Sequence, residues 1–147
     1  MRLADPAYCE NLVAAGIDEY FISVTAADAE THDRITEVPG SFEKTTRALR
    51  NLDQIPGVRL MTNTVVTRLS YRTVPEVIDL FSDLKQLIQM DFWGYWPMEE
   101  DGNPELLVSH LEVRPYLKEL IRRARRLIGI SKSKTFRPAC WARTLGL

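Results

Sequence analysis

Short apolar runs alternate along this chain with segments of helical periodicity, and this alternation limits the possible folds more than any other feature. The runs Tyr20–Val24, Val58–Val66 and Met90–Trp96 are rich in β-branched and aromatic residues. Such composition is typical of parallel strands buried on both faces. Helical segments precede, separate and follow the runs, at a spacing that suits crossover connections. The order predicts an α/β protein: a partial, TIM-like (β/α) barrel of about three parallel strands.

Four helices are predicted from residues that favour helix ends. They are expected to begin at Asp5–Pro6, at Ser41, at a capping box Thr73–Glu76, and near Pro115. The third is expected to continue to Ile88 because apolar residues recur there every three or four positions. The segment Thr31–Ile35 is expected to be a loop.

The size of the chain favours one domain with a short extension. It has 147 residues, which suits one globular unit. We expect a domain over residues 1–130 and a basic C-terminal tail over 131–147. The sequence has no apolar stretch long enough to span a membrane and no apolar segment of a secretory signal near Met1. These features predict a cytoplasmic protein.

Charge is distributed unevenly. Residues 1–111 hold 9 basic and 18 acidic residues, whereas residues 112–147 hold 10 basic and 2 acidic ones. A basic segment can bind nucleic acid or an acidic partner. No aromatic residues interleave with the arginines at 122–126 as a base-stacking surface would require. We therefore favour a solvated helix face over a nucleic-acid site.

Four pieces of sequence together resemble the radical S-adenosylmethionine (radical SAM) superfamily. They are Gly16–Val24, Thr31–Ile35, Gly40–Phe42 and Asn63–Arg68. In that family a helix ends in a similar glycine turn, a strand ends in serine before a similar loop, and a later strand has a similar asparagine-containing pattern. The order and spacing of the pieces carry the resemblance, which covers residues 5 to about 100.

The resemblance implies half of a (β/α)6 barrel that binds S-adenosylmethionine at the carboxyl ends of its strands. In the family, a Cys-x3-Cys-x2-Cys loop ligates a [4Fe–4S] cluster, and reduction of the cofactor yields a 5′-deoxyadenosyl radical. This sequence has no such loop. It has two cysteines, Cys9 and Cys140, fewer than a cluster requires. The chain is therefore expected to be the middle and C-terminal part of an iron–sulfur oxidoreductase, inactive alone, acting on an unknown substrate.

Ser23 and Asn63 are the first two candidate cofactor-binding residues. Alternation along the first strand places Ser23 on the face opposite Ile22 and Val24, and the resemblance matches it to a position that contacts the cofactor's carboxylate or ribose. Asparagine is disfavoured within strands and must find hydrogen-bond partners when buried. The resemblance assigns Asn63 to the ribose hydroxyls. The alternative for both is a side chain satisfied by the surrounding protein.

Arg68 and Trp96 complete the candidate set. Arg68 follows the second strand and could bind a carboxylate or phosphate with both guanidinium nitrogens, or simply lie on the surface. Trp96 belongs to the aromatic segment that closes the third strand, which the resemblance places beside the adenine. Core packing is the alternative for these rings. No catalytic residue is assigned, and no zinc-ligand spacing is found.

Three further residues are weighed and assigned to structure. His32 and Asp33 suggest acid–base catalysis, but a turn-capping role for Asp33 is favoured. Cys140 lies in a Pro-x-Cys segment similar to one found in some relatives, and a lone cysteine is more often a small buried apolar residue.

Two other readings remain open. An exposed sheet edge predicts a partner polypeptide that supplies the missing half-barrel, or self-association, and the chain is then a non-catalytic interaction module. A weaker reading is a phosphate-binding β/α enzyme, for which Gly40 is thin support. The chain could come from a truncated, split or degenerate gene.

Overall fold

The computed structural model describes residues 1–97, 102–130 and 135–138, and its strands form one parallel sheet. The strands are β1 (Glu19–Ser23), β2 (Arg59–Val66), β3 (Leu87–Gly94) and β4 (Thr135–Pro138). They lie in sequential order, and each is parallel to its neighbour. The predicted α/β class and parallel strands are confirmed, and the sheet is consistent with part of a β/α barrel.

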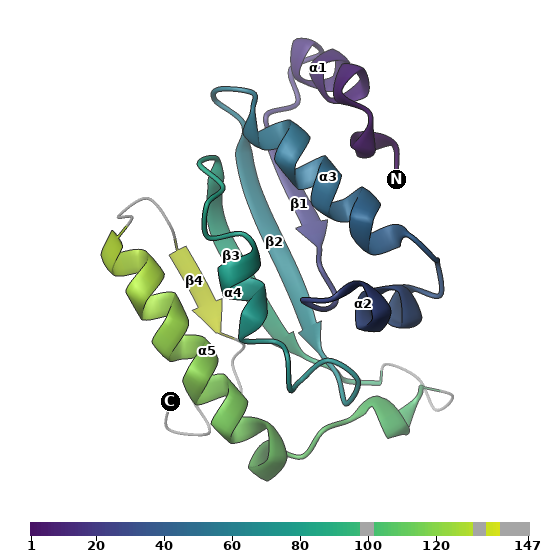
Figure 1. The fold of residues 1–147 in the computed structure, drawn as a ribbon, viewed down its shortest axis with the longest axis vertical. Helices are drawn as coiled ribbons and strands as arrows, with labels where there is room; N and C mark the ends of the chain where they lie inside the picture. The colour runs from purple at the N-terminus through teal and green to yellow at the C-terminus, as the bar shows by residue number, and fades with distance from the viewer. Residues whose placement is uncertain (98–101, 131–134, 139–147) are drawn as a thin grey trace.

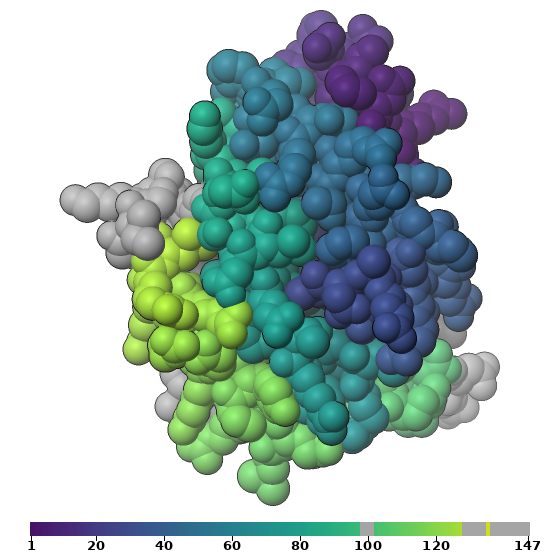
Figure 2. Space-filling view, in the orientation of Figure 1, coloured from purple at the N-terminus to yellow at the C-terminus, as the bar shows by residue number. Residues whose placement is uncertain are grey.

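The helices lie on one face of this sheet (Figure 1). They are α1 (Pro6–Ala14), α2 (Ala29–Thr36), α3 (Ser41–Asp53), α4 (Glu76–Leu80) and α5 (His110–Ile130), with single 3-10 turns η1 (Arg2–Ala4) and η2 (Pro104–Leu106). Helices α3, α4 and α5 lie over the strands, and α2 sits at the carboxyl end of β1. Their side chains form a nearly continuous layer over this face (Figure 2). A sequential parallel sheet covered on one face is barrel-like, because open doubly wound sheets carry helices on both faces.

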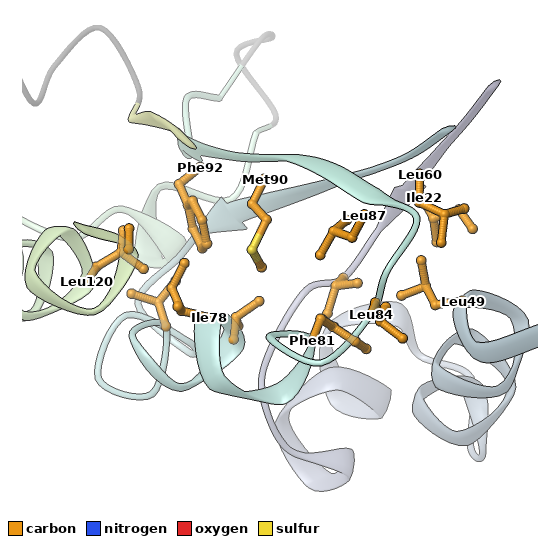
Figure 3. Close-up of a cluster of buried hydrophobic side chains, with 14 of the residues drawn as sticks. Ile22, Leu49, Leu60, Ile78, Phe81, Leu84, Leu87, Met90, Phe92 and Leu120 are labelled. Carbon is orange, nitrogen blue, oxygen red and sulfur yellow. The ribbon is translucent and has the colours of Figure 1, made fainter. Parts of the chain in front are cut away.

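The core fills the space between the sheet and these helices. Met90 and Phe92 of β3 point toward Ile78 of α4 and Leu120 of α5, and Ile22 and Leu60 point toward Leu49 of α3 (Figure 3). All seven of these residues are at most 4% exposed. Alternate residues of each strand therefore supply the core, and the residues between them face the uncovered side of the sheet.

A bulge in β3 sets which residues face that uncovered side. Leu60 pairs with Leu87, but Met61 pairs with Gln89, so Ile88 is an extra residue. Beyond the bulge, Met90 and Phe92 point into the core. Gln89, Asp91 and Trp93 consequently take the opposite face, in register with β2.

Several predicted elements differ from the structure. The segment Thr31–Ile35, expected to be a loop, belongs to α2, whose N-cap Asp28 accepts a hydrogen bond from the Thr31 amide at 2.8 Å. The strand β4 was not anticipated, because four residues within a basic segment show no strand pattern. Ser41 is not the N-cap of α3; that position is Gly40, with φ +75°.

The predicted limits of the third and fourth helices are also wrong. α4 ends at Leu80, because Leu84 and Leu87 reach the core from a turn and from β3. Thr73 does not form the expected capping box: its hydroxyl donates to the Ser70 carbonyl instead. α5 begins at His110 rather than near Pro115, because a capping box is formed at its start. There Ser109 and Glu112 each accept a hydrogen bond from the other's amide.

Candidate functional site

A row of polar residues crosses the uncovered face of the sheet. Ser23 on β1 is in register with Asn63 on β2, which is in register with Asp91 on β3. Neighbouring strands lie about 4.8 Å apart, so the side chains of one row are immediate neighbours. The structure therefore brings the predicted Ser23 and Asn63 together on one face, beside a carboxylate that the sequence analysis did not select.

Asn63 is the least satisfied member of this row. Its side chain is only 7% exposed, and its Oδ1 atom is buried without a hydrogen-bond partner in the described structure. Buried amide oxygens are normally hydrogen-bonded, because losing water without a replacement costs free energy. A bound group that donates a hydrogen bond would satisfy this atom.

Two aromatic rings lie on the same face of the sheet as Asn63. Phe21 lies two residues before Ser23, and Trp93 lies two residues after Asp91, so the register places them diagonally on either side of Asn63. Their ring centroids are 6.5 Å apart, at an interplanar angle of 51°. Both rings are half exposed.

Asp91 has one described partner within the same face. The Gln89 Nε2 atom donates to both carboxylate oxygens, at 3.1 and 3.0 Å. The Asp91 side chain is 7% exposed. An ionised carboxylate accepts about four hydrogen bonds, so capacity remains for a ligand.

A separate pocket of about 370 Å³ opens at the carboxyl ends of β2 and β3. Its wall is largely apolar and aromatic, with Val66, Tyr95, Trp96, Leu107, Val108 and Val113 among its lining residues. Trp96 is 76% exposed, so it is not a core residue. The structure thus places Trp96 where a planar apolar group could be held.

Arg68 is occupied by protein groups. Its Nε atom donates to the Leu107 carbonyl at 2.9 Å, and its two terminal nitrogens donate to the Glu112 carboxylate at 3.2 Å each. Hydrogen bonds from Arg68 and Ser109 lower the pKa of Glu112 to about 2. This contact joins the end of β2 to the start of α5, and Leu107, whose carbonyl accepts from Arg68, lines the pocket. It does not bring the guanidinium to Ser23 and Asn63.

His32 and Asp33 organise the start of α3. Asp33 accepts hydrogen bonds from the Phe42 amide at 2.8 Å, the Gly40 amide at 2.6 Å and the Ser41 hydroxyl at 2.9 Å. The amide of Phe42 contributes most to lowering the pKa of Asp33, followed by the Gly40 amide and then by the Ser41 hydroxyl. These contacts agree with the structural role predicted for Asp33.

His32 is buried in the core and is not accessible as a general base. It is 2% exposed, its Nδ1 atom lies 3.1 Å from the Ser41 hydroxyl, and its ring packs edge-on against Phe42. Burial lowers its pKa despite the neighbouring Asp33.

The described residues do not offer ligands for an iron–sulfur cluster. Cys9 is buried in α1, where its thiol donates to the Leu3 carbonyl at 3.2 Å. Burial raises the pKa of this thiol, which opposes the thiolate that metal binding needs. In the described part of the chain, no three His, Cys, Asp or Glu residues are grouped as metal ligands. Cys140 lies outside the described residues.

Sequence comparison identifies proteins that are similar to this chain. Three curated proteins, each named AdoMet-dependent heme synthase, are similar to this chain. They come from Nitratidesulfovibrio vulgaris (31% identity over 78 residues), Methanosarcina barkeri (30% over 82) and Oleidesulfovibrio alaskensis (36% over 70). The resemblance to radical SAM proteins is confirmed.

This similarity is limited in extent. The alignments cover 48–56% of the chain but only 18–23% of each relative, so the radical SAM likeness concerns about one fifth of their length. No family model matches the sequence. In the described part of the chain, no helix is both long and apolar enough to cross a bilayer.

Asp91 and Gln89 were missed by the sequence analysis, although a signal was present. In the run from Gln89 to Trp93, polar and apolar residues alternate through Met90 and Phe92. The same alternation argument that placed Ser23 on the first strand can be used on the third strand. It places Asp91 on the same face as Ser23 and Asn63.

Proposed function

We propose that this chain is part of a radical SAM barrel and that its uncovered sheet face holds S-adenosylmethionine. The observation that supports this most is the buried, unpartnered Asn63 Oδ1 atom, in register with Ser23. A ribose hydroxyl would donate to Asn63, and Ser23 can donate to, or accept from, a further polar group of the cofactor. Together with a [4Fe–4S] cluster, the cofactor would supply 5′-deoxyadenosyl-radical chemistry.

The pocket at the strand ends is proposed to receive the adenine ring. Its apolar lining and the exposed indole of Trp96 suit a planar base. Arg68 has a supporting role in this proposal: its contacts with Leu107 and Glu112 hold the pocket wall in place. It would contact the cofactor only if it released Glu112.

Cluster chemistry is proposed to depend on ligands that the printed sequence does not contain. We expect the isolated chain to bind the cofactor without cleaving it. Reduction with dithionite in the presence of S-adenosylmethionine should yield no 5′-deoxyadenosine. Formation of 5′-deoxyadenosine by the isolated chain would contradict this part of the proposal.

Equilibrium dialysis with labelled S-adenosylmethionine tests the binding site. We expect saturable binding that Asn63→Ala weakens at least about tenfold, because the variant removes a hydrogen bond in a buried setting. Trp96→Ala should weaken it by a smaller factor. Asn11→Ala, at an exposed position on α1, is the matched control and should leave the affinity unchanged. Absence of saturable binding, or equal affinity for Asn63→Ala, would overturn the assignment.

A second candidate is a non-catalytic module that completes its sheet with another polypeptide or a second copy. It is favoured by β1, which pairs on only one side in the described structure, because an unpaired strand edge can add a further strand. The half-exposed Phe21 and Trp93 on the uncovered face also favour it. Sedimentation equilibrium tests self-association: concentration-dependent dimers support it, and a monomer at all concentrations contradicts it.

A further inference from the structure

We propose that Asp91, together with Asn63 and the rings of Phe21 and Trp93, binds an ammonium group of an organic ligand other than S-adenosylmethionine. The site extends across the uncovered sheet face from β1 to β3 and shares Asn63 with the proposed cofactor site. It goes beyond the proposed cofactor function, because its main anchor is a carboxylate that the cofactor proposal does not use.

The first support is the state of the two oxygen-bearing side chains. Asn63 and Asp91 are each more than nine-tenths buried, and they are neighbours in register. The Asn63 Oδ1 atom has no partner in the described structure, and the only described donor to Asp91 is the Gln89 amide. The Asn63 Oδ1 atom and the Asp91 carboxylate are both hydrogen-bond acceptors, and each can accept further hydrogen bonds.

The unused capacity defines the ligand chemistry. A single group that satisfies two adjacent acceptors must bring at least two donors. An ammonium group brings three donors and a positive charge. Its hydrogen bond to the carboxylate is charge-assisted, and such bonds are stronger than those between neutral groups. Buried carboxylates are normally matched by a cation.

The second support is the aromatic pair. Phe21 and Trp93 approach each other across Asn63, with 6.5 Å between ring centroids. Both remain half exposed, so part of each ring is accessible to a ligand. Aromatic faces attract organic cations, and tryptophan does so most strongly. A carboxylate beside an indole is thus suited to an amine more than to a neutral alcohol.

Arg137 holds the register position next to Asp91 on β4, and its side chain lies outside the described structure. The experiment must therefore separate a ligand ammonium from Arg137, and its outcome decides between them.

Titration of the full chain with benzylammonium, followed in ¹H–¹⁵N spectra, tests the proposal. We expect saturable shifts of the Trp93 indole and of the Asn63 and Gln89 side-chain amides. The neutral analogue benzyl alcohol should cause none at equal concentration. Asp91→Asn should weaken benzylammonium binding about tenfold or more. The exposed Asp18→Asn is the matched control and should bind as the unmodified chain does.

Two further arms keep the result interpretable. Arg137→Gln should bind benzylammonium as tightly as the unmodified chain, or more tightly. Loss of binding in this variant overturns the proposal. If Asp91→Asn does not fold, Trp93→Ala replaces it and should weaken binding several-fold. The proposal is also overturned if benzyl alcohol binds as tightly as benzylammonium. It is likewise overturned if the folded variant, Asp91→Asn or Trp93→Ala, binds benzylammonium as tightly as the unmodified chain does.

The affinity for S-adenosylmethionine is measured on the same variants. Asp91→Asn should leave it unchanged, because the proposed cofactor site uses Asn63 and Ser23 but not Asp91; an equal loss of affinity for both ligands would mean that the cofactor's own ammonium occupies Asp91 and would overturn the inference. A chain that binds benzylammonium but not S-adenosylmethionine would retain this site while contradicting the proposed cofactor function.

Discussion

The carboxylate of Asp33 accepts the hydroxyl hydrogen of Ser41 at 2.9 Å, and this pair joins α2 to the start of α3. Two backbone amides, of Gly40 and Phe42, donate to the same carboxylate. The amides at a helix start lack partners within the helix and carry partial positive charge. Asp33 therefore caps α3 from the preceding helix, and this explains why Ser41 does not need to do so.

Replacement of Asp33 by alanine should lower the thermal midpoint by a few degrees, because the capped amides and Ser41 lose their acceptor. Differential scanning calorimetry measures the change. Glu30→Gln, in the exposed first turn of α2, is the control and should shift the midpoint by less than one degree or so. Equal shifts for the two variants would contradict the capping role.

His32 should make folding less stable in mild acid. Burial lowers its pKa below the ordinary value of 6.5, so the unfolded chain binds a proton before the folded chain does. The contribution of neutral His32 is therefore complete above pH 6.5 and declines as pH falls toward the folded-state pKa. Urea denaturation at pH 7.5 and pH 5 should show a lower midpoint at pH 5.

An NMR titration of the His32 ring provides the direct check. The folded protein should show a midpoint below 6.5, and in His32→Gln the loss of stability between pH 7.5 and 5 should be smaller. A ring that titrates above 6.5 would show that Asp33, rather than burial, dominates its environment.

Arg68→Gln should return the pKa of Glu112 from about 2 toward its ordinary value of 4.5, because the Arg68 hydrogen bonds are the largest cause of the shift. Carbon-detected NMR titration of the Glu112 carboxylate measures this. Arg125→Gln, on the exposed side of α5, is the control and should leave Glu112 near 2. If Glu112 remains near 2 in Arg68→Gln, Ser109 rather than Arg68 holds the carboxylate.

Phe92→Ala should destabilise the fold by about 3–5 kcal/mol, because it leaves a cavity between β3 and the helices. Phe92 is 1% exposed and packs into the core of Figure 3. Chemical denaturation provides the free energy of unfolding. Leu111→Ala, at an 82% exposed position, should change it by less than about 0.5 kcal/mol. A similar loss of unfolding free energy in both variants would contradict the assignment of Phe92 to the core.

The sequence predicted those features that depend on local pattern. The three strand segments 20–24, 58–66 and 90–96 overlap β1, β2 and β3, and the cap at Asp5 is present, where its carboxylate accepts from the Ala7 amide. Alternation correctly placed Ser23 on the face opposite Ile22. The radical SAM resemblance, read from short motifs, agrees with the later comparison.

Predictions from local sequence pattern were wrong where contacts with distant residues decide between a helix and a turn, or between two possible capping boxes. The spacing of Leu84 and Leu87 fits a helix, but the Gln86 amide donates to Asp53 Oδ1 at 2.7 Å, and this contact with the end of α3 favours a turn there. Ser109 and Thr73 both precede capping-box sequences, yet only the former forms one. Local sequence offers both choices, and burial against the rest of the chain decides.

The sequence by itself determined the class of this protein, its parallel strands and the residue types available at their ends, because hydrophobic period and capping chemistry act within a few residues. Only the tertiary structure decided that Asp91 joins Ser23 and Asn63, and that Arg68 is held by Glu112. Both results depend on register between strands and on contacts between segments about 30 to 45 residues apart. Such contacts form only when the sheet and its helices pack together, since no local pattern encodes which distant group will be adjacent.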